Sequence, residues 1–286
     1  VIADRIAIFV DNVYSNYVQY SGWYLIVATI LFAFQIYCDF YGYSTIAVGT
    51  AQILDIHLMD NFDSPYLSMS VKEFWRRWHI SLSSWLRDYL YIPLGGNQKG
   101  KVRKYFNLMV VFLASGLWHG ANWSYVVWGA LNGIYQITGD MLKPVREKMT
   151  SLFKIKKDLI GNKIVKVIVT FCLVDFSWIF FRASNIKEAL EIIKSIFSAN
   201  NPWIIFDGSL FECGLDSKDF LVVMISLFLL LLLDLFKYKK VNIAEIIEKQ
   251  AFWFRWIVYI MVIIGTLVFG IWGTSYVEKE FIYFQF

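Results

Sequence analysis

The chain has 286 residues, of which 58% are hydrophobic, 19% aromatic and 17% charged, and its mean hydropathy is +0.51. This composition excludes an ordinary soluble domain and indicates an integral membrane protein. The formal net charge of +4 is gathered into short Lys/Arg clusters beside apolar runs, as in the cytoplasmic loops of membrane proteins, and it is not the signature of a nucleic-acid-binding protein.

The cysteines and histidines predict neither a disulfide framework nor a metal site. The three cysteines have no paired spacing, and the three histidines are scattered along the chain, so no recognisable ligand set is present. The chain starts at Val1 without a visible signal peptide. We expect that its N-terminus is truncated.

The first sixty-five residues predict one clear membrane span. Residues 1–10 are apolar but contain two charges, which favours an interfacial or helix-terminal segment. Residues 23–38 form the first span, which we expect to end at the polar patch of residues 39–43. The weaker run 45–56 is rich in small residues, which favours close packing or a re-entrant segment. Residues 57–65 are polar and turn-rich, and we expect a loop.

Residues 70–93 predict a single interfacial helix of about twenty residues. Ser70 and Glu73 have the spacing of a capping box, and Pro93 begins the stop. At about 100° per residue, the large apolar side chains form one stripe and the charged ones lie largely opposite. A basic, Trp-rich, amphipathic helix of this kind lies along a membrane surface or between other helices. His79 falls at the border of the two faces.

Two apolar runs, 105–117 and 123–137, lie between basic clusters at 100–104 and 143–157. If both clusters are cytoplasmic, the segment between them is a hairpin with His119 at its tip. A helix of thirteen residues rises about 20 Å, short of the ~30 Å hydrocarbon core. We therefore expect His119 to lie inside the membrane, nearer its far side.

The remaining sequence predicts three further spans, 164–181, 220–236 and 256–272, whose charge clusters agree on one orientation. Residues 183–219 form a mixed extracytoplasmic stretch with helical periodicity at 186–197, and residues 273–286 form an extracytoplasmic tail. The predicted fold class is therefore all-α, a polytopic transmembrane protein with re-entrant and interfacial amphipathic helices.

His119 and His79 are the strongest candidates for chemistry. A buried neutral imidazole is well matched to taking a proton from a hydroxyl near pH 7, and the glycines beside His119 leave space for a substrate. The alternative is a structural histidine that hydrogen-bonds a carbonyl at a helix break. His79 has the same two interpretations, and His57 lies in a polar loop where solvation is expected.

Charged residues beside these histidines have two interpretations each. Arg76, Arg77 and Arg87 fit an anionic donor such as coenzyme A, or lipid headgroups at the membrane surface. Asp175 lies inside a predicted span and needs a partner, which Arg182 or a hairpin histidine can supply.

Two segments carry a more specific signal: EFWRRWHISLS with WLRDYLYIPLGG, residues 73–96, and GLWHGA, residues 116–121. They closely resemble the membrane-bound O-acyltransferase (MBOAT) family, in particular the membrane subunits of bacterial alginate, peptidoglycan and exopolysaccharide O-acetyltransferases. The resemblance continues through residues 1–11, 39–44, 180–183 and 281–284. It implies one MBOAT domain over residues 1–286 that lacks the family's N-terminal spans.

The resemblance also implies a reaction. A cytoplasmic acyl thioester such as acetyl-CoA donates its acyl group within a membrane tunnel to a hydroxyl presented from the other side, with no bound cofactor. His119 maps onto the catalytic histidine and His79 onto a histidine of the same passage. The neighbouring tunnel or donor residues are Arg76, Arg77, Trp78, Trp118 and Asn122.

The implied setting is the bacterial cytoplasmic membrane, where a multi-pass protein contacts lipid, a polysaccharide acceptor and an extracytoplasmic partner acyltransferase. Two alternatives stay open. One is a D-alanyl transferase for teichoic acid that takes its acyl group from a carrier protein. The other is a proton-coupled transporter or flippase, against which the absence of internal repeats argues.

Overall fold

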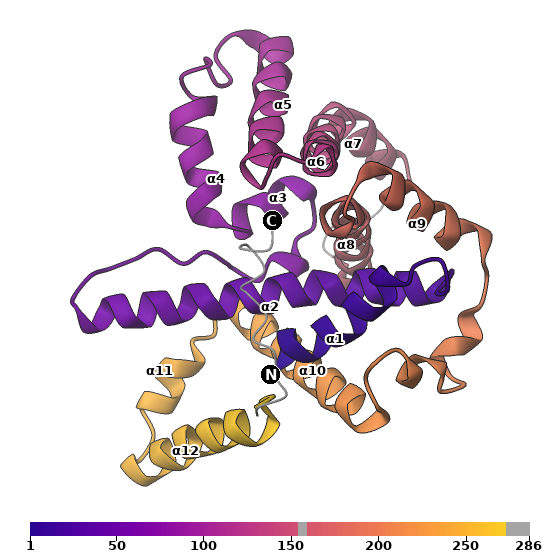
Figure 1. Ribbon diagram of the computed structural model, residues 1–286. Helices are drawn as coiled ribbons and strands as arrows, with labels where there is room; N and C mark the ends of the chain where they lie inside the picture. Colours follow the sequence, from indigo (N-terminus) through magenta and orange to yellow (C-terminus); the bar gives the residue numbers. More distant parts are fainter. Residues whose placement is uncertain (154–158, 273–286) are drawn as a thin grey trace. The chain divides into compact units, whose positions relative to one another are not determined.

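The computed structural model describes residues 1–153 and 159–272 (Figure 1), and their regular structure is helical, without a strand among them. The predictions for residues 154–158 and 273–286, which include the end of the second basic cluster, the tail and residues 281–284, lie outside this description. The helices are α1 (Ile2–Ser15), α2 (Trp23–Ile53), α3 (Val71–Arg77), α4 (Ile80–Leu86), α5 (Gly100–Trp118), α6 (Trp123–Met141), α7 (Lys143–Leu152), α8 (Ile160–Arg182), α9 (Ile186–Ser198), α10 (Ser217–Tyr238), α11 (Ile243–Glu248) and α12 (Phe252–Phe269), with short turns η1 (Pro65–Leu67), η2 (Arg87–Tyr91), η3 (Pro202–Ile205) and η4 (Ser209–Glu212).

Four helices of the described chain are long and apolar enough to cross a membrane: α2, α8, α10 and α12. Three of them, α8, α10 and α12, match the predicted spans 164–181, 220–236 and 256–272 to within a few residues. Helix α9 coincides with the predicted periodic stretch 186–197, and residues 55–64 form the predicted loop. The prediction of an all-α, polytopic membrane fold is confirmed.

Helix α2 corrects the prediction for residues 23–56. It is one continuous helix of 31 residues, which rises about 46 Å, and it does not end at the polar patch. The hydroxyls of Ser44 and Thr45 bond back to the Tyr41 carbonyl at 3.1 and 2.7 Å, and Thr50 bonds to the Ile46 carbonyl at 2.9 Å. Because the helix itself satisfies these polar groups, the separate re-entrant segment predicted for 45–56 is wrong.

The described chain divides into two compact units, and the first comprises residues 1–40 and 198–272. Its core forms where α1 packs on α10. Ile6, Phe9 and Val10 are fully buried, and the Phe9 and Phe220 rings lie 6.2 Å apart. Arg5, one of the two charged residues that favoured an interfacial segment for residues 1–10, is paired within this unit. Its Nε donates to Asp219 Oδ1 at 2.9 Å. The segment is therefore an integral, buried part of a helix.

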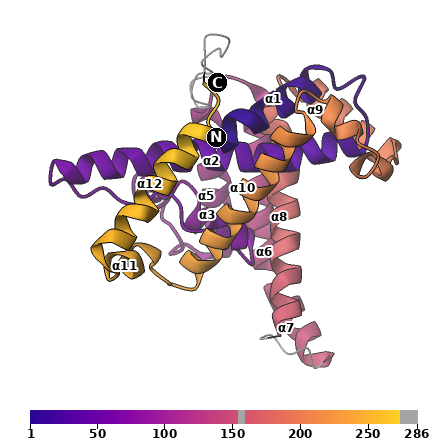
Figure 2. The same cartoon turned by 90° about the horizontal axis from the view of Figure 1, so that it is seen from below.

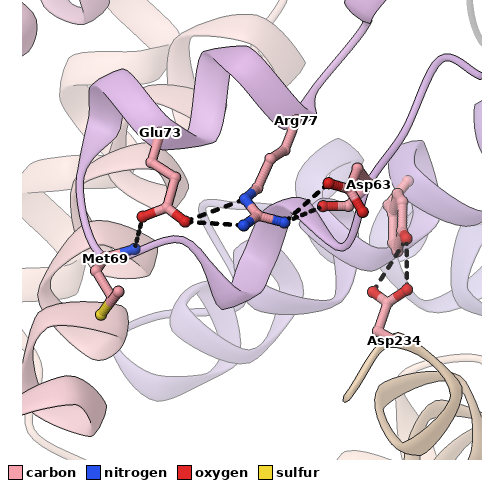
Figure 3. Close-up of polar contacts among 6 residues, drawn as sticks. Asp63, Met69, Glu73, Arg77 and Asp234 are labelled. Atoms are coloured by element: carbon pink, nitrogen blue, oxygen red, sulfur yellow. Dashed lines mark hydrogen bonds and ion pairs between the residues drawn. The ribbon is translucent and has the colours of Figure 1, made fainter. Parts of the chain in front are cut away.

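A buried hydrogen bond also joins α2 to α10 in this unit. Tyr37 and Asp234 are both almost fully buried. The Tyr37 hydroxyl lies 3.0 Å from each carboxylate oxygen of Asp234, whose side chain Figure 3 shows. A carboxylate in the apolar part of a helix is costly unless a donor faces it, so this contact accounts for an acidic residue in α10.

The second unit comprises residues 41–197 and carries both candidate histidines. Its α5 and α6 form a hairpin of two adjacent helices (Figure 1), α3 and α8 pack on α6, and α7 lies by the N-terminal end of α8 (Figure 2). Asn132 of α6 joins three elements, because its amide accepts from Trp75 Nε1 of α3 at 3.1 Å and donates to Ser177 Oγ of α8 at 3.2 Å. Aromatic rings fill the space around it.

The hairpin helices are longer than predicted. Each has 19 residues and rises about 28 Å, close to the ~30 Å hydrocarbon core. The charged residues at the open ends belong to the helices: Lys101, Arg103 and Lys104 lie within α5, and Asp140 lies within α6. The hairpin is therefore longer than expected, and the placement of His119 inside the membrane, nearer its far side, stays a prediction.

Candidate active site

His79 lies at a break between two helices. The single helix predicted from residue 70 to residue 93 is wrong, because α3 ends at Arg77 and α4 begins at Ile80. His79 has φ +44° and ψ +57°, a left-handed conformation that costs free energy for a residue other than glycine. The predicted cap is present, since Ser70 Oγ accepts from the Glu73 backbone N–H at 3.2 Å. The Glu73 carboxylate accepts from the Met69 N–H.

The break changes which residues of the predicted apolar stripe are buried. Phe74 and Trp78, before or at the break, are 1% exposed, whereas Trp85 and Tyr89 beyond it are 55% and 69% exposed. A continuous helix would have placed all four on one face. The chain instead turns at His79 and carries that imidazole into the core of the unit.

His119 caps the C-terminal end of α5, at the tip of the hairpin. Its backbone N–H bonds to the Gly116 carbonyl at 3.2 Å, and Gly120 follows with φ +147°. A side chain at Gly116 would meet the Tyr125 carbonyl oxygen at 2.3 Å. Gly116 therefore allows α5 and α6 to approach closely, and the expectation that it leaves space for a substrate is corrected.

The two imidazoles lie against the same indole. The Trp118 ring centroid is 6.0 Å from that of His79 and 5.0 Å from that of His119. The His119 ring also packs edge-on against Phe181 at 5.0 Å and Trp128 at 5.2 Å. Both histidines are buried, with 8% and 7% of their surface exposed. Burial of this kind penalises a charged group, so the surroundings favour neutral imidazoles.

A cavity of about 460 Å³ lies close to this cluster, and neither His79 nor His119 is among the residues that line it. Trp75 lines the cavity, and its ring packs on Trp128 at 5.6 Å, which in turn contacts His119. Ile80, next to His79, lines it as well. The lining also includes the basic side chains of Lys72, Arg76, Arg87 and Lys104 and the acidic side chain of Asp140. Its apolar part includes Leu82, Leu86, Leu108, Val111 and Phe112.

Two of the basic side chains of the cavity are already paired. Lys104 forms an ion pair with Asp140, and Arg87 Nε lies 2.7 Å from Asp88 Oδ1. The hydrogen bond from Arg87 lowers the pKa of Asp88, which keeps that pair ionised. Arg76 and Lys72 make no ion pair within the described parts of the chain. They are the side chains best able to meet an anionic ligand.

The other predicted site residues have structural contacts. Arg77 is held between Glu73, at 3.0 Å, and Asp63, at 3.0 Å, as Figure 3 shows. Trp78 stacks on Phe74 at 5.4 Å inside the aromatic core. The structure thus gathers His79, His119 and Trp118 together and places Arg76 on the cavity wall.

Asn122 also has a structural contact on each side of its amide. It caps α6 by accepting from the Ser124 N–H at 3.0 Å, and it donates to the Ser184 carbonyl at 2.7 Å. A substrate-binding role for Arg77, Trp78 and Asn122 stays a prediction.

The model of the membrane-bound O-acyltransferase family matches residues 1–181, which include both histidines and the cavity. The chain belongs to this family.

Individual relatives in this and neighbouring branches share the matched region. The chain is 38% identical over 200 residues to the peptidoglycan O-acetyltransferase of Helicobacter pylori, an alignment that covers 70% of this chain and 36% of that protein. It is 40% identical over 203 residues to the probable alginate O-acetylase AlgI of Pseudomonas syringae pv. tomato, covering 69% and 36%. It is 33% identical over 169 residues to the teichoic acid D-alanyltransferase of Streptococcus thermophilus, covering 53% and 39%. The chain spans less than two-fifths of the length of these relatives.

Within this MBOAT chain, sequence reasoning missed Lys72, Lys104 and Trp75 as cavity residues. Lys72 stands four residues before Arg76, a spacing that places both on one helix face, so this signal was available. Lys104 belongs to the basic cluster at residues 100–104, from which only the orientation of the hairpin in the membrane was predicted. The buried Oδ1 atom of Asp175 accepts no hydrogen bond within the described residues, and its pairing with Arg182 or a hairpin histidine stays a prediction.

Proposed function

We propose that this chain is the catalytic part of a membrane O-acyltransferase of the bacterial cytoplasmic membrane. It moves an acyl group, in our proposal acetyl, from a cytoplasmic thioester to hydroxyls of a cell-surface polysaccharide, directly or through an extracytoplasmic partner acyltransferase. The observation that carries this proposal is the meeting of two buried imidazoles at Trp118, close to a cavity whose lining includes several basic side chains. The relatives named for alginate and peptidoglycan acetylation support the choice of polysaccharide and of acetyl.

In the proposed mechanism His119 is the general base. Its imidazole takes the proton of the acceptor hydroxyl while the oxygen attacks the thioester carbonyl. The tetrahedral intermediate then collapses, the carbon–sulfur bond breaks, and the thiolate leaves and takes up a proton. Proton transfer by a positioned base is worth roughly 10²–10⁴ in rate, and burial among aromatic rings keeps the base neutral and ready to accept. His79, across Trp118, orients the acceptor.

The lining of the cavity supports an acyl thioester such as acetyl-CoA as the proposed donor. Arg76 and Lys72 can bind phosphate groups, for which guanidinium and ammonium groups are well suited. The apolar wall of Leu82, Leu108 and Val111 can cover an uncharged arm that leads to the thioester. A volume of about 460 Å³ falls within the range of small-molecule sites.

The decisive experiment is mass spectrometry of surface glycan from cells with and without the intact gene. We expect the O-acetyl groups of one polysaccharide to disappear when the gene is deleted and to return when it is restored. An unchanged content of ester-linked acyl groups in every surface glycan of the deletion strain would contradict the proposed function.

A D-alanyl transferase for teichoic acid is the alternative that a comparison favours, because the Streptococcus thermophilus relative bears that name. It uses the same class of reaction with a different acyl group. The same glycan analysis separates the two, since a missing D-alanyl ester and a missing acetyl ester differ in mass. The transporter alternative has no support in the family match.

A further inference from the structure

The left-handed turn at His79 is held by a loop residue, Asn61, that sequence reasoning did not single out. The Asn61 carbonyl accepts from the Ile80 backbone N–H at 3.0 Å. Its side-chain Oδ1 accepts from the Ser81 backbone N–H at 3.2 Å and from the Ser81 hydroxyl at 2.6 Å. These three hydrogen bonds, all accepted by Asn61, offset the cost of the unusual conformation at His79.

The orientation of the Asn61 amide follows from these contacts. A backbone N–H can only donate, so the Asn61 atom that faces the Ser81 N–H must be the oxygen. The Ser81 hydroxyl has one proton, and two oxygens 2.6 Å apart repel unless a proton lies between them. That proton therefore belongs to the bond from Ser81 to Asn61.

The position of the His79 proton follows in turn. The same Ser81 oxygen lies 3.4 Å from His79 Nδ1. Because its own proton points to Asn61, the hydroxyl can only accept from this nitrogen. Nδ1 must then carry the imidazole proton, which leaves the lone pair of a neutral ring on Nε2.

We propose that Asn61 and Ser81 are positioning residues that hold His79 in its Nδ1-protonated tautomer, so that Nε2 accepts a hydrogen bond from the substrate hydroxyl. An imidazole in the other tautomer would present an N–H to the substrate, and it could not accept the same bond. The identity of that hydroxyl rests on the proposed function, whereas the tautomer rests on the contacts of Asn61 and Ser81 alone.

The test is solid-state NMR of the full-length protein in lipid bilayers, with histidine rings labelled by ¹⁵N. The His79 signals are identified by their loss in His79→Gln. We expect wild-type His79 to be protonated at Nδ1 and the Ser81→Ala variant to shift its proton to Nε2. Ser81→Thr keeps the hydroxyl and should keep the wild-type tautomer. Ser151→Ala, which removes an exposed hydroxyl of α7, is the matched control without effect.

The acyl-transfer rates of the same variants test the consequence. We expect Ser81→Ala to lower the rate about tenfold, the factor that corresponds to ~1.4 kcal/mol of hydrogen bonding, and Ser81→Thr to restore it. A wild-type His79 protonated on Nε2, or a tautomer unaffected by Ser81→Ala, would overturn the inference. So would a shifted tautomer with an unchanged rate.

The proposed function and the proposed role of Ser81 can be contradicted independently of each other. If the tautomer responds as expected but no surface glycan loses its acyl groups in the deletion strain, the proposed function is wrong and the role of Ser81 in the tautomer stands.

Discussion

The two candidate histidines reach the same indole by different local means. The position of His79 depends on its left-handed backbone, which Asn61 holds. The position of His119 depends on Gly120, which follows it in the hairpin turn with a positive φ. Each device places an imidazole among aromatic rings, where a polar side chain is costly without a functional or hydrogen-bonding reason. At the scale of single residues, the site is defined by these two turns.

Replacement of His119 separates the proposed base from a structural histidine. We expect His119→Ala to lower acyl transfer by roughly 10²–10⁴, because the variant loses the group that takes the hydroxyl proton. Transfer is measured in isolated membranes, together with the amount of protein they retain. His57→Ala is the control, since His57 is exposed in the loop after α2, and it should transfer at the wild-type rate. Retained activity in a well-expressed His119→Ala protein would remove the assignment.

Arg76 and Arg77 are adjacent in sequence but have different surroundings, which predicts different effects. Arg76→Gln should raise the KM for acetyl-CoA by about tenfold, the loss of one charge-assisted contact with phosphate, and leave the protein stable. Arg77→Gln should instead destabilise the protein, because it leaves Glu73 and Asp63 without their guanidinium. Arg146→Gln, on the exposed surface of α7, serves as the control. An unchanged KM in Arg76→Gln would exclude Arg76 from the phosphate-binding site.

At this scale the sequence singles out the two histidines but does not predict the backbone conformation at His79. His119 and His79 stand out because they are titratable groups among apolar residues. The break at His79 has no such signal, since neither proline nor glycine is present there. It arises from Asn61, eighteen residues earlier in the chain, and single-sequence periodicity carries no information about such a tertiary contact.

Elements are joined in the second unit by close approach and by buried polar contacts. Gly116 and Gly129 face the opposing helix backbone across the α5–α6 hairpin, so that the helices approach more closely than larger residues would allow. Asn132 then ties α6 to α3 and α8. The long apolar runs of α8 and α10 were predicted from sequence, because length and hydropathy decide them. The continuity of α2 was not predicted, because the hydroxyls of its polar residues form hydrogen bonds with backbone carbonyls of the same helix.

The hairpin contact can be tested with one added methyl group. In Gly129→Ala the new Cβ would lie 2.3 Å from the Phe112 carbonyl oxygen, so the helices must separate. Overpacking of this kind costs about 1–3 kcal/mol, and we expect the thermal midpoint in detergent to fall by about 2–10 °C and acyl transfer to decrease, because His119 moves with α5. Gly139→Ala on the same helix meets nothing within 4 Å and should be neutral or slightly stabilising. Equal behaviour of the two variants would refute this packing.

On the scale of the whole chain, the residues that hold each unit together come from distant parts of the sequence. Arg5 and Asp219 pair within the first unit, and Trp75, Asn132 and Ser177 meet within the second. The charges at residues 4 and 5 signal that a partner is needed, but hydropathy and charge do not say which one. Membrane topology, unlike these pairings, depends on the distribution of Lys and Arg along the chain. The sequence alone can therefore predict it.

The predicted topology places the open end of the α5–α6 hairpin in the cytoplasm and α9 outside. Lys101 of α5 lies within the basic cluster that should stay inside, whereas Lys187 of α9 follows α8, a candidate span that leaves from that side. Both lysines are exposed, so cysteines at these positions form a matched pair in a chain whose three native cysteines are replaced. We expect a membrane-impermeant thiol reagent to label Lys187→Cys in intact spheroplasts and Lys101→Cys only after permeabilisation. Labelling of Lys101→Cys from outside would contradict the predicted orientation.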